Sequence, residues 1–329
     1  MNKHVLDINP QETADQICKS ITGILGKVLH RRGLIVALSG GVDSSVCAAL
    51  GVRALGADKV FGLLLPEKDS SSASRDLGQE VAQQLGIKYL TEDISSTLEA
   101  IGCYRWRDQV IWSLFPDFQP GWKNKLVIRG GLQGRINYFE LVVQKPNGEI
   151  HSKRLPHREY LQIVAATNFK QRIRKTLEYF HADRLHYAVV GTPNMLEYDL
   201  GFFVKNGDGS ADIKPIAHLY KTQVYALARY LELPSEVCNA VPTTDTYSMP
   251  QAQDEFYFAL PYEQMDLCLY GLNNNIPCEE VAAAMLELTP EQVSFVYQDI
   301  EAKRKTTRYL HLRPQLIEDG SSVNFSSAI

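Results

Sequence analysis

A short run of small and polar residues, SGGVDSS at 39–45, carries the strongest chemical signal in the chain. It follows the apolar segment LIVALS (34–39) and leads into VCAALGVRAL (46–55), whose composition favours a helix. Glycines let a backbone approach a phosphate group closely, and the amides at a helix N-terminus attract anions. We therefore expect a phosphate-binding loop, with contacts from Ser39, Gly40, Gly41, Asp43, Ser44 and Ser45.

Asp43 is the unexpected member of this loop, because a carboxylate repels phosphate groups unless a cation lies between them. A magnesium ion that bridges Asp43 and pyrophosphate would remove the conflict, since this hard ion prefers oxygen ligands. The loop is not a Walker A motif, because no Lys-Ser or Lys-Thr pair follows the glycines. An ordinary glycine-serine turn is the alternative interpretation of the run.

The loop resembles the S-G-G-x-D-S loop of the ATP pyrophosphatases, which cleave ATP between its α and β phosphates. A second block, GTPNMLEYDLGFFVKNGDGSADIKPIAHLYK (191–221), resembles the NAD synthase pattern G-T-x4-E, G-[FY]-F-T-K, G-D-G-x2-D and a later lysine. The spacing holds from Thr192 to Lys221, although Val204 replaces a threonine. With NFKQRIRK (168–175), the resemblance covers roughly 10–100 and 165–310, and the chain is similar to the ammonia-dependent NAD synthases.

The resemblance implies a role for each matching residue. Magnesium would be held by Asp43 and Glu197, and catalysis would involve Asp43, Lys205 and Lys221. Beyond the loop itself, ATP would be contacted by Thr192, Lys221 and Thr243. The acceptor, deamido-NAD, would be bound by Arg172, Lys205, Asp212 and Lys303. In the implied reaction the acceptor carboxylate is adenylated, pyrophosphate is released and ammonia displaces AMP.

These residues also have interpretations without function. Glu197 and Lys221 suit solvated helix faces, and Arg172 lies in a run with other basic residues that suits a charged face. The Gly-Asp-Gly at 207–209 suits an ordinary turn.

Three departures from the family pattern fall where the acceptor is expected to bind. Ala302 stands where the family has a histidine before Lys303, and residues 256–258 are aromatic where acidic and small residues are expected. Residues 103–162 are an insertion that most of the family lacks. A related ligase that amidates a different carboxylate is therefore the alternative. An RNA-modifying enzyme with the same loop is a third interpretation, but it would predict a basic patch and often paired cysteines, and the sequence shows neither. A non-catalytic nucleotide-binding protein is the fourth interpretation.

Apolar runs that alternate with helical segments indicate the elements that position these residues. Four short runs predict parallel strands: LIVALS (34–39), VFGLLLP (60–66), IKYLTED (87–93) and HYAVVGT (186–192). The first two are continuous apolar runs, which suit strands buried on both faces. Helices are expected between them, near 46–55, 72–85 and 94–102. The pattern predicts a doubly wound parallel α/β sheet, and the resemblance implies the adenine-nucleotide alpha-hydrolase type.

Other segments surround this sheet. A first helix is expected to start with Asn9 as its cap and Pro10 in first position, and to end before Gly33. The insertion at 103–162 contains β-forming runs with Pro-Asn-Gly as a hairpin turn. Further helices are expected near 262–271, 278–287 and 290–306, before a flexible tail at 318–329. We treat residues 1–329 as one domain that contains the insertion.

The 329 residues carry a formal charge of −4, which argues against a nucleic-acid-binding protein. The six cysteines lack C-x-x-C spacing, so neither a zinc nor a redox motif is expected. Without a signal sequence or an apolar run long enough for a membrane span, we expect a cytoplasmic enzyme. The resemblance implies a homodimer. Because the helix at 10–31 leads almost directly into the loop, no amidase domain is expected, and free ammonia or a separate glutaminase would supply the nitrogen.

Overall fold

The computed structural model describes residues 1–2, 4–129, 138–240, 246–250, 257–258, 260–285 and 287–315. Three expectations lie outside these ranges: the ATP contact of Thr243, the aromatic residue Phe256 and the flexible tail at 318–329. All six cysteines are free thiols. None of the described helices is both long enough and apolar enough to cross a membrane.

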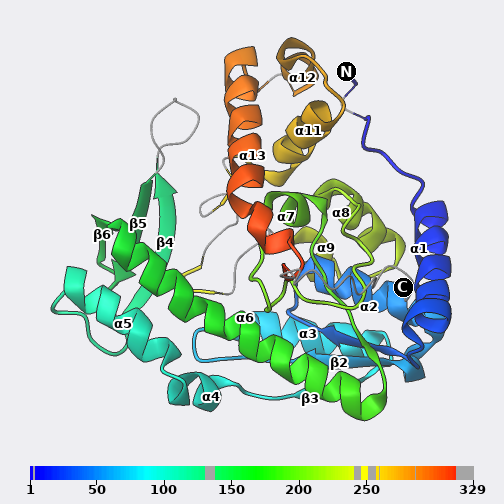
Figure 1. Ribbon diagram of the computed structural model, residues 1–329, viewed down its shortest axis with the longest axis horizontal. Coiled ribbons are helices and arrows are strands. Elements are labelled where there is room, and N and C mark those ends of the chain that lie inside the picture. The colour runs from blue at the N-terminus through cyan, green and yellow to red at the C-terminus, as the bar shows by residue number, and fades with distance from the viewer. Residues whose placement is uncertain are drawn as a thin grey trace, which may run out of the picture.

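A four-stranded parallel sheet lies in the larger lobe of the molecule (Figure 1). The order is β3-β2-β1-β7, from β1 (Leu34–Ala37), β2 (Val60–Leu64), β3 (Lys88–Thr91) and β7 (Ala188–Val189). A short 3-10 turn, η2 (Ala57–Lys59), precedes β2. From β1 the chain adds β2 and then β3 on one side of β1, and it later adds β7 on the other side. In such sheets ligands bind beside the carboxyl ends of the strands where the order reverses, so the loops after β1 and β7 mark the expected site. The doubly wound fold is confirmed.

Helices cover both faces of this sheet, and alternate residues of each strand face opposite layers. Leu34 and Val36 belong to one core, with α1 (Pro10–Ile24), α2 (Val42–Leu55), α3 (Ser72–Gln84) and α8 (Lys221–Tyr230). Ile35 belongs to the core of the other face, with α4 (Ser95–Ala100) and α6 (His157–Leu185). Successive strand residues point to opposite faces, and both faces are buried at β1, β2 and β7, so these strands are continuous apolar runs, whereas the edge strand β3 is mostly exposed.

The first helix begins at Pro10 and ends before Gly33, as its sequence indicates. Asn9 accepts hydrogen bonds from amides of the first turn, and Pro10 takes the first helical position. The helix continues as a π-helical turn, η1 (Leu25–Leu29), and ends at His30, which has a left-handed φ of 50°. The helix therefore ends before Gly33, as predicted, although His30 and not a glycine adopts the left-handed turn. Gly33 allows a close backbone approach, because a Cβ there would lie 2.3 Å from a carbonyl oxygen.

The predicted insertion lies beside the central sheet and has a hydrophobic core of its own (Figure 1). It contains α5 (Cys103–Leu114) and an antiparallel sheet of β4 (Lys123–Arg129), β5 (Tyr138–Gln144) and β6 (Ile150–Arg154). The Pro-Asn-Gly turn is present, with Gly148 at a φ of 89°. Residues 103–114 are helical and residues 157–162 begin α6, and neither feature was predicted from the sequence.

The C-terminal helices share a second core, separate from that of the sheet. These helices are α11 (Tyr262–Asn273), α12 (Cys278–Met285) and α13 (Pro290–His311). A capping box between Thr289 and Gln292 starts α13. The short helix α7 (Met195–Leu200) packs into the same core, whereas α9 (Ser235–Asn239) packs against the sheet layer. Because α7 directly follows the loop after β7, this packing connects the C-terminal helices to the expected site.

Candidate active site

Glycine and serine residues shape the phosphate loop. Gly40 has a left-handed φ of 79°, and a Cβ on it would lie 2.2 Å from the carbonyl oxygen of Ser74 in α3. Only glycine fits there without displacing α3. The hydroxyls of Ser44 and Ser45 donate to the carbonyl at the start of α2, at 3.0 and 2.9 Å. The structure thus gathers all the expected loop residues at a helix N-terminus: Ser39, Gly40, Gly41, Asp43, Ser44 and Ser45.

Asp43, Asn194, Glu197 and Lys221 meet beside this loop. The Lys221 ammonium pairs with Asp43 Oδ2, and Asn194 Nδ2 donates to Asp43 Oδ1 at 3.1 Å. Asn194 Oδ1 accepts from the Glu197 amide at 3.2 Å, in a capping box that starts α7. Thr192 lies half-buried two residues earlier, on the same edge of the sheet. Residues that the sequence pattern singled out on three separate elements therefore share one site.

Lys221 is a fixed positive charge within this cluster. Burial alone would lower the pKa of its ammonium, because the side chain is only 3% exposed. The carboxylates of Asp43 and Glu197 reverse that effect and raise the pKa above the ordinary lysine value. Burial, followed by the same two carboxylates, also raises the pKa of the Cys47 thiol. Cys47 is therefore protonated and unsuited to act as a nucleophile.

The oxygen atoms of the cluster suit a magnesium ion. Asp43 and Glu197 offer carboxylates, and the adjacent loop would present phosphate oxygens to the same place. Within the described part of the chain, no group of three or more His, Cys, Asp or Glu side chains could hold a metal by itself. A bound ion would therefore take most of its ligands from phosphate and water, as Mg²⁺ at nucleotide sites commonly does.

Three residues expected to bind the acceptor lie between α6 and α13. Arg172 Nε donates to the carbonyl of Lys205 at 3.3 Å. The Lys205 ammonium in turn donates to the Tyr309 carbonyl at the end of α13, at 2.8 Å. Lys303, on the same helix, forms an ion pair with Asp299 at 2.5 Å. Arg172 and Lys205 are thus neighbours, whereas Lys303 binds Asp299 on its own helix and the Tyr257 carbonyl, at 2.6 Å.

Asp212 has a different environment. Its Oδ2 accepts the amide of Val189 in β7 at 2.7 Å, and its Oδ1 accepts the hydroxyl of Tyr179 at 3.3 Å. Both oxygens therefore hold the edge strand against α6. A contact to the acceptor would have to use the remaining lone pairs of these oxygens or replace one of the two hydrogen bonds.

Asp266 is a candidate positioning residue that sequence reasoning missed. It lies fully buried on α11, and its Oδ2 accepts the amide of Thr222 at 2.8 Å. That amide belongs to the first turn of α8, directly after Lys221, where free N–H groups and the helix dipole favour a carboxylate. Asp266 therefore fixes the end of the helix that presents Lys221. Its one signal in the sequence is an acidic residue between two apolar neighbours, Met265 and Leu267.

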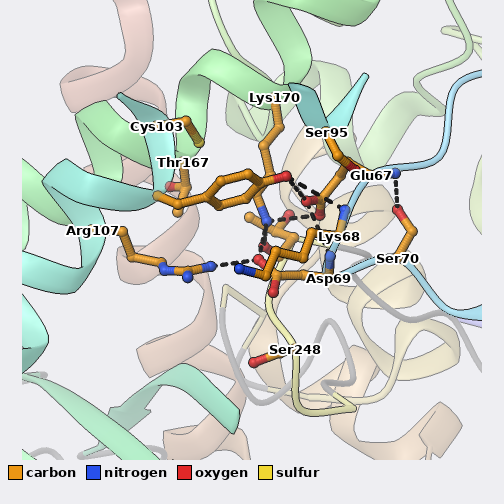
Figure 2. Close-up of polar contacts among 12 residues, drawn as sticks. Glu67, Lys68, Asp69, Ser70, Ser95, Cys103, Arg107, Thr167, Lys170 and Ser248 are labelled. Carbon is orange, nitrogen blue, oxygen red and sulfur yellow. Dashed lines mark hydrogen bonds and ion pairs between the residues drawn. The ribbon is translucent and has the colours of Figure 1, made fainter. Parts of the chain in front are cut away.

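A second polar cluster lies beyond the carboxyl end of β2, and the motifs gave no indication of it (Figure 2). Lys170 binds Glu67 and Asp69, while Arg107 binds Asp69. All four side chains are buried. The cluster joins the strand β2 to both α5 and α6.

Helix N-termini that favour anions, oxygen donors for a divalent cation and a fixed ammonium group converge at the switch point of a parallel sheet. These are the requirements for binding a nucleoside triphosphate, so the fold and site define an α/β nucleotide-binding protein. The chain belongs to the NAD synthase family, whose model matches residues 13–110 and 136–307. The internal stretch that the family model leaves unmatched, 111–135, lies inside the predicted insertion.

Similar proteins agree with this assignment. The chain is 56% identical to an NH(3)-dependent NAD(+) synthetase of Rhizobium meliloti, over 95% of this chain and 93% of the relative. It is 55% identical to one of Mesorhizobium japonicum, over 95% and 98%. Among solved structures, an NH3-dependent NAD synthetase of Campylobacter jejuni superposes with a TM-score of 0.61 at 22% identity, covering 94% of this chain and all of that one. This structural likeness supports the fold.

Proposed function

We propose that this chain is an ATP-dependent ligase that amidates deamido-NAD with ammonia, releasing NAD, AMP and pyrophosphate. The cluster of Asp43, Asn194, Glu197 and Lys221 beside the phosphate loop carries the proposal. It offers anion-binding amides, oxygen donors for a cation and a fixed positive charge where ATP would be cleaved. Relatives named NH(3)-dependent NAD(+) synthetase, at 53% identity or more over almost the whole chain, support the acceptor and the nitrogen source.

The first step joins the acceptor to AMP. A carboxylate oxygen of deamido-NAD attacks the α-phosphorus of ATP, and the bond from this phosphorus to the bridging oxygen breaks. The electrons of that bond stay with pyrophosphate, which remains bound at the loop 39–45. The loop amides and Lys221 stabilise the negative charge of pyrophosphate as it develops. When bound by Asp43 and Glu197, Mg²⁺ would supply further charge neutralisation.

The second step forms the amide. The nitrogen of ammonia attacks the acyl carbon, the bond from this carbon to the AMP oxygen breaks, and the nitrogen loses a proton. Our proposal assigns acceptor binding to Arg172, Lys205, Asp212 and Lys303. Cys47, the cysteine nearest the loop in sequence, takes no part, because its thiol is buried and protonated. Positioning of two anions and neutralisation of their charge supply most of the catalysis.

A different carboxylate is the second candidate for the acceptor. Ala302 lacks the imidazole that the family has beside Lys303. The neighbouring Tyr257 ring stacks on Phe202 at 4.6 Å, which makes this region more apolar than the family pattern. These differences concern the acceptor and leave the ATP site unchanged.

We further propose a homodimer in the cytoplasm. The six free cysteines suit a reducing compartment such as the cytoplasm.

The dimer is supported by exposed apolar side chains on the long helix α6, which carries Arg172. Leu161 and Phe180 are exposed there, and such side chains favour an interface. Sedimentation analysis should give twice the chain mass, and the monomer mass at micromolar concentration would contradict the dimer.

The proposal is tested by product analysis. Purified protein is incubated with ATP, magnesium, ammonium and deamido-NAD, and NAD formation is followed by mass spectrometry. Glutamine replaces ammonium in a control and should give little product without a glutaminase partner. Absence of NAD, from protein that still binds ATP, would favour the second acceptor.

A further inference from the structure

The Lys170 ammonium connects segments that are distant in the sequence (Figure 2). Its side chain is 1% exposed. The Nζ atom lies 2.8 Å from both Glu67 Oε1 and Asp69 Oδ2, and 2.7 Å from the carbonyl oxygen of Thr246. Glu67 and Asp69 belong to the segment that leaves β2, and Thr246 belongs to a described segment at 246–250. One buried cation therefore holds both segments together.

The insertion completes this buried cluster from α5. The Tyr104 hydroxyl donates to Glu67 Oε2 at 2.7 Å, and Arg107 pairs with Asp69 Oδ2 at 2.5 Å. Burial would raise the pKa of Asp69, but Lys170 and Arg107 lower it below the ordinary value. Two cations thus compensate the two buried carboxylates, and Arg107 also pairs with the partly exposed Asp108 at 2.7 Å. Loss of any partner would leave a buried charge poorly compensated, so the geometry has few alternatives.

The same insertion holds segment 246–250 by its sheet. The Met249 amide donates to the Asn124 carbonyl at the edge of β4 at 3.1 Å, and the Asn124 amide donates to Ser248 Oγ at 2.8 Å. Tyr247 is buried in the hydrophobic core of the insertion, and Met249 packs with a neighbouring apolar pair on β4 and β5. Segment 246–250 is therefore anchored on the insertion by backbone and side-chain contacts.

A short mechanical path leads from the cluster to the phosphate loop. The segment that contains Glu67 and Asp69 runs directly into α3, and the carbonyl of Ser74 in α3 packs against Gly40. A Cβ on Gly40 would lie 2.2 Å from this carbonyl, so α3 and the loop have almost no free space between them. A displacement of the β2 exit segment would therefore be transmitted to the phosphate loop.

We propose that the insertion positions the ATP site through Tyr104, Arg107 and Asn124. Lys170 connects the two segments that these residues hold. The insertion fixes the β2 exit segment and segment 246–250, and through α3 it fixes the phosphate loop. The inference rests on the proposed binding of ATP at that loop, and it is independent of which carboxylate is amidated.

Two hydroxyl deletions test this role, and each leaves the charges of the cluster in place. Tyr104→Phe removes the hydrogen bond to Glu67, and Ser248→Ala removes the acceptor of the Asn124 amide. Ser113→Ala is the matched control, because its hydroxyl bonds the Val110 carbonyl within α5 and touches neither segment. The dissociation constant of Mg-ATP is measured by titration calorimetry without acceptor, and the melting temperature of each variant is recorded.

We expect Tyr104→Phe and Ser248→Ala to weaken ATP binding about fivefold to tenfold, the effect of one lost hydrogen bond, with Ser113→Ala unchanged. In turnover assays the KM for ATP should rise more than kcat falls. Lower melting temperatures with ATP affinity within twofold of the unmodified protein would overturn the proposal, because the insertion would then only stabilise the fold. If Tyr104→Phe does not fold, Ser248→Ala decides alone. If the unmodified protein does not convert deamido-NAD, the proposed function is contradicted. The ATP-binding comparison of the variants remains valid in that case.

Discussion

Neutralising Asp266 should change how the stability of the protein depends on pH. Asp266 is fully buried on α11 and accepts the Thr222 amide beside Lys221. Burial raises the pKa of its carboxyl from the ordinary 3.8 to about 7, against the lowering effect of the Thr222 amide and of Lys221. The substitution Asp266→Asn keeps an oxygen that can accept the same amide and removes the titration.

The magnitude follows from proton linkage. The carboxyl is protonated in the folded protein up to about pH 7, but it is ionised in the unfolded chain above about pH 4. Between these two pH values, folding is therefore accompanied by the uptake of one proton. Its contribution to stability is complete below the unfolded pKa and is lost as pH rises through the folded pKa. At about 1.4 kcal/mol per pH unit, the whole window amounts to about 4 kcal/mol.

Urea unfolding of both proteins at about pH 5 and about pH 8 measures this effect. The free energy of unfolding of the unmodified protein should fall relative to Asp266→Asn by about 3 kcal/mol between the two conditions, since about two pH units of the window lie above pH 5. Other titrating groups are common to both proteins and cancel. Asp15→Asn, which neutralises a mostly exposed carboxylate, is the control and should show no such change. A constant difference between the unmodified protein and Asp266→Asn would refute the reasoning.

Three further predictions concern the loop and its charges. Asp43→Asn should reduce pyrophosphate release by a factor of about 100 or more, because it removes a charge that Mg²⁺ and the transition state need. Glu197 still compensates the buried Lys221 ammonium, so the variant should fold with reduced stability. Pyrophosphate release within tenfold of the unmodified protein would contradict the metal assignment. Lys221→Met should lower the free energy of unfolding by about 3 kcal/mol, since it leaves the carboxylates of Asp43 and Glu197 uncompensated. Added Mg²⁺ should raise the melting temperature of this variant more than that of the unmodified protein. Gly40→Ala should cost about 1–3 kcal/mol of stability and weaken ATP binding, because its Cβ would strike the Ser74 carbonyl; unchanged ATP affinity by calorimetry would show that the loop tolerates the shift.

The features that sequence patterns revealed depend on local order. The loop at 39–45 is a contiguous run whose glycine, helix and strand neighbours all lie within a few residues. The strands β1, β2 and β7 are buried on both faces, so each is recognisable as an apolar run without knowledge of its partners. Thr192, Glu197 and Lys221 were found because the family pattern fixes their spacing along one stretch of chain.

The features that were missed depend on contacts between distant residues. Lys170 and Glu67 are separated by 103 positions, and nothing near either residue indicates an ion pair. Asp266 is an isolated acid in a helix, and only the packing of α11 on α8 gives it a partner. The left-handed residue that ends the first helix was not foreseen for a different reason: such a turn is more usual at glycine, and here His30 adopts it.

The central claim is that the cluster beside the phosphate loop adenylates a carboxylate and that ammonia displaces AMP. The most direct measurement is the release of AMP and pyrophosphate from Mg-ATP and ammonium, with and without deamido-NAD. The account predicts equal amounts of AMP, pyrophosphate and NAD, formed only when deamido-NAD is present. Release of ADP and phosphate, or AMP formation that ignores deamido-NAD, would contradict it.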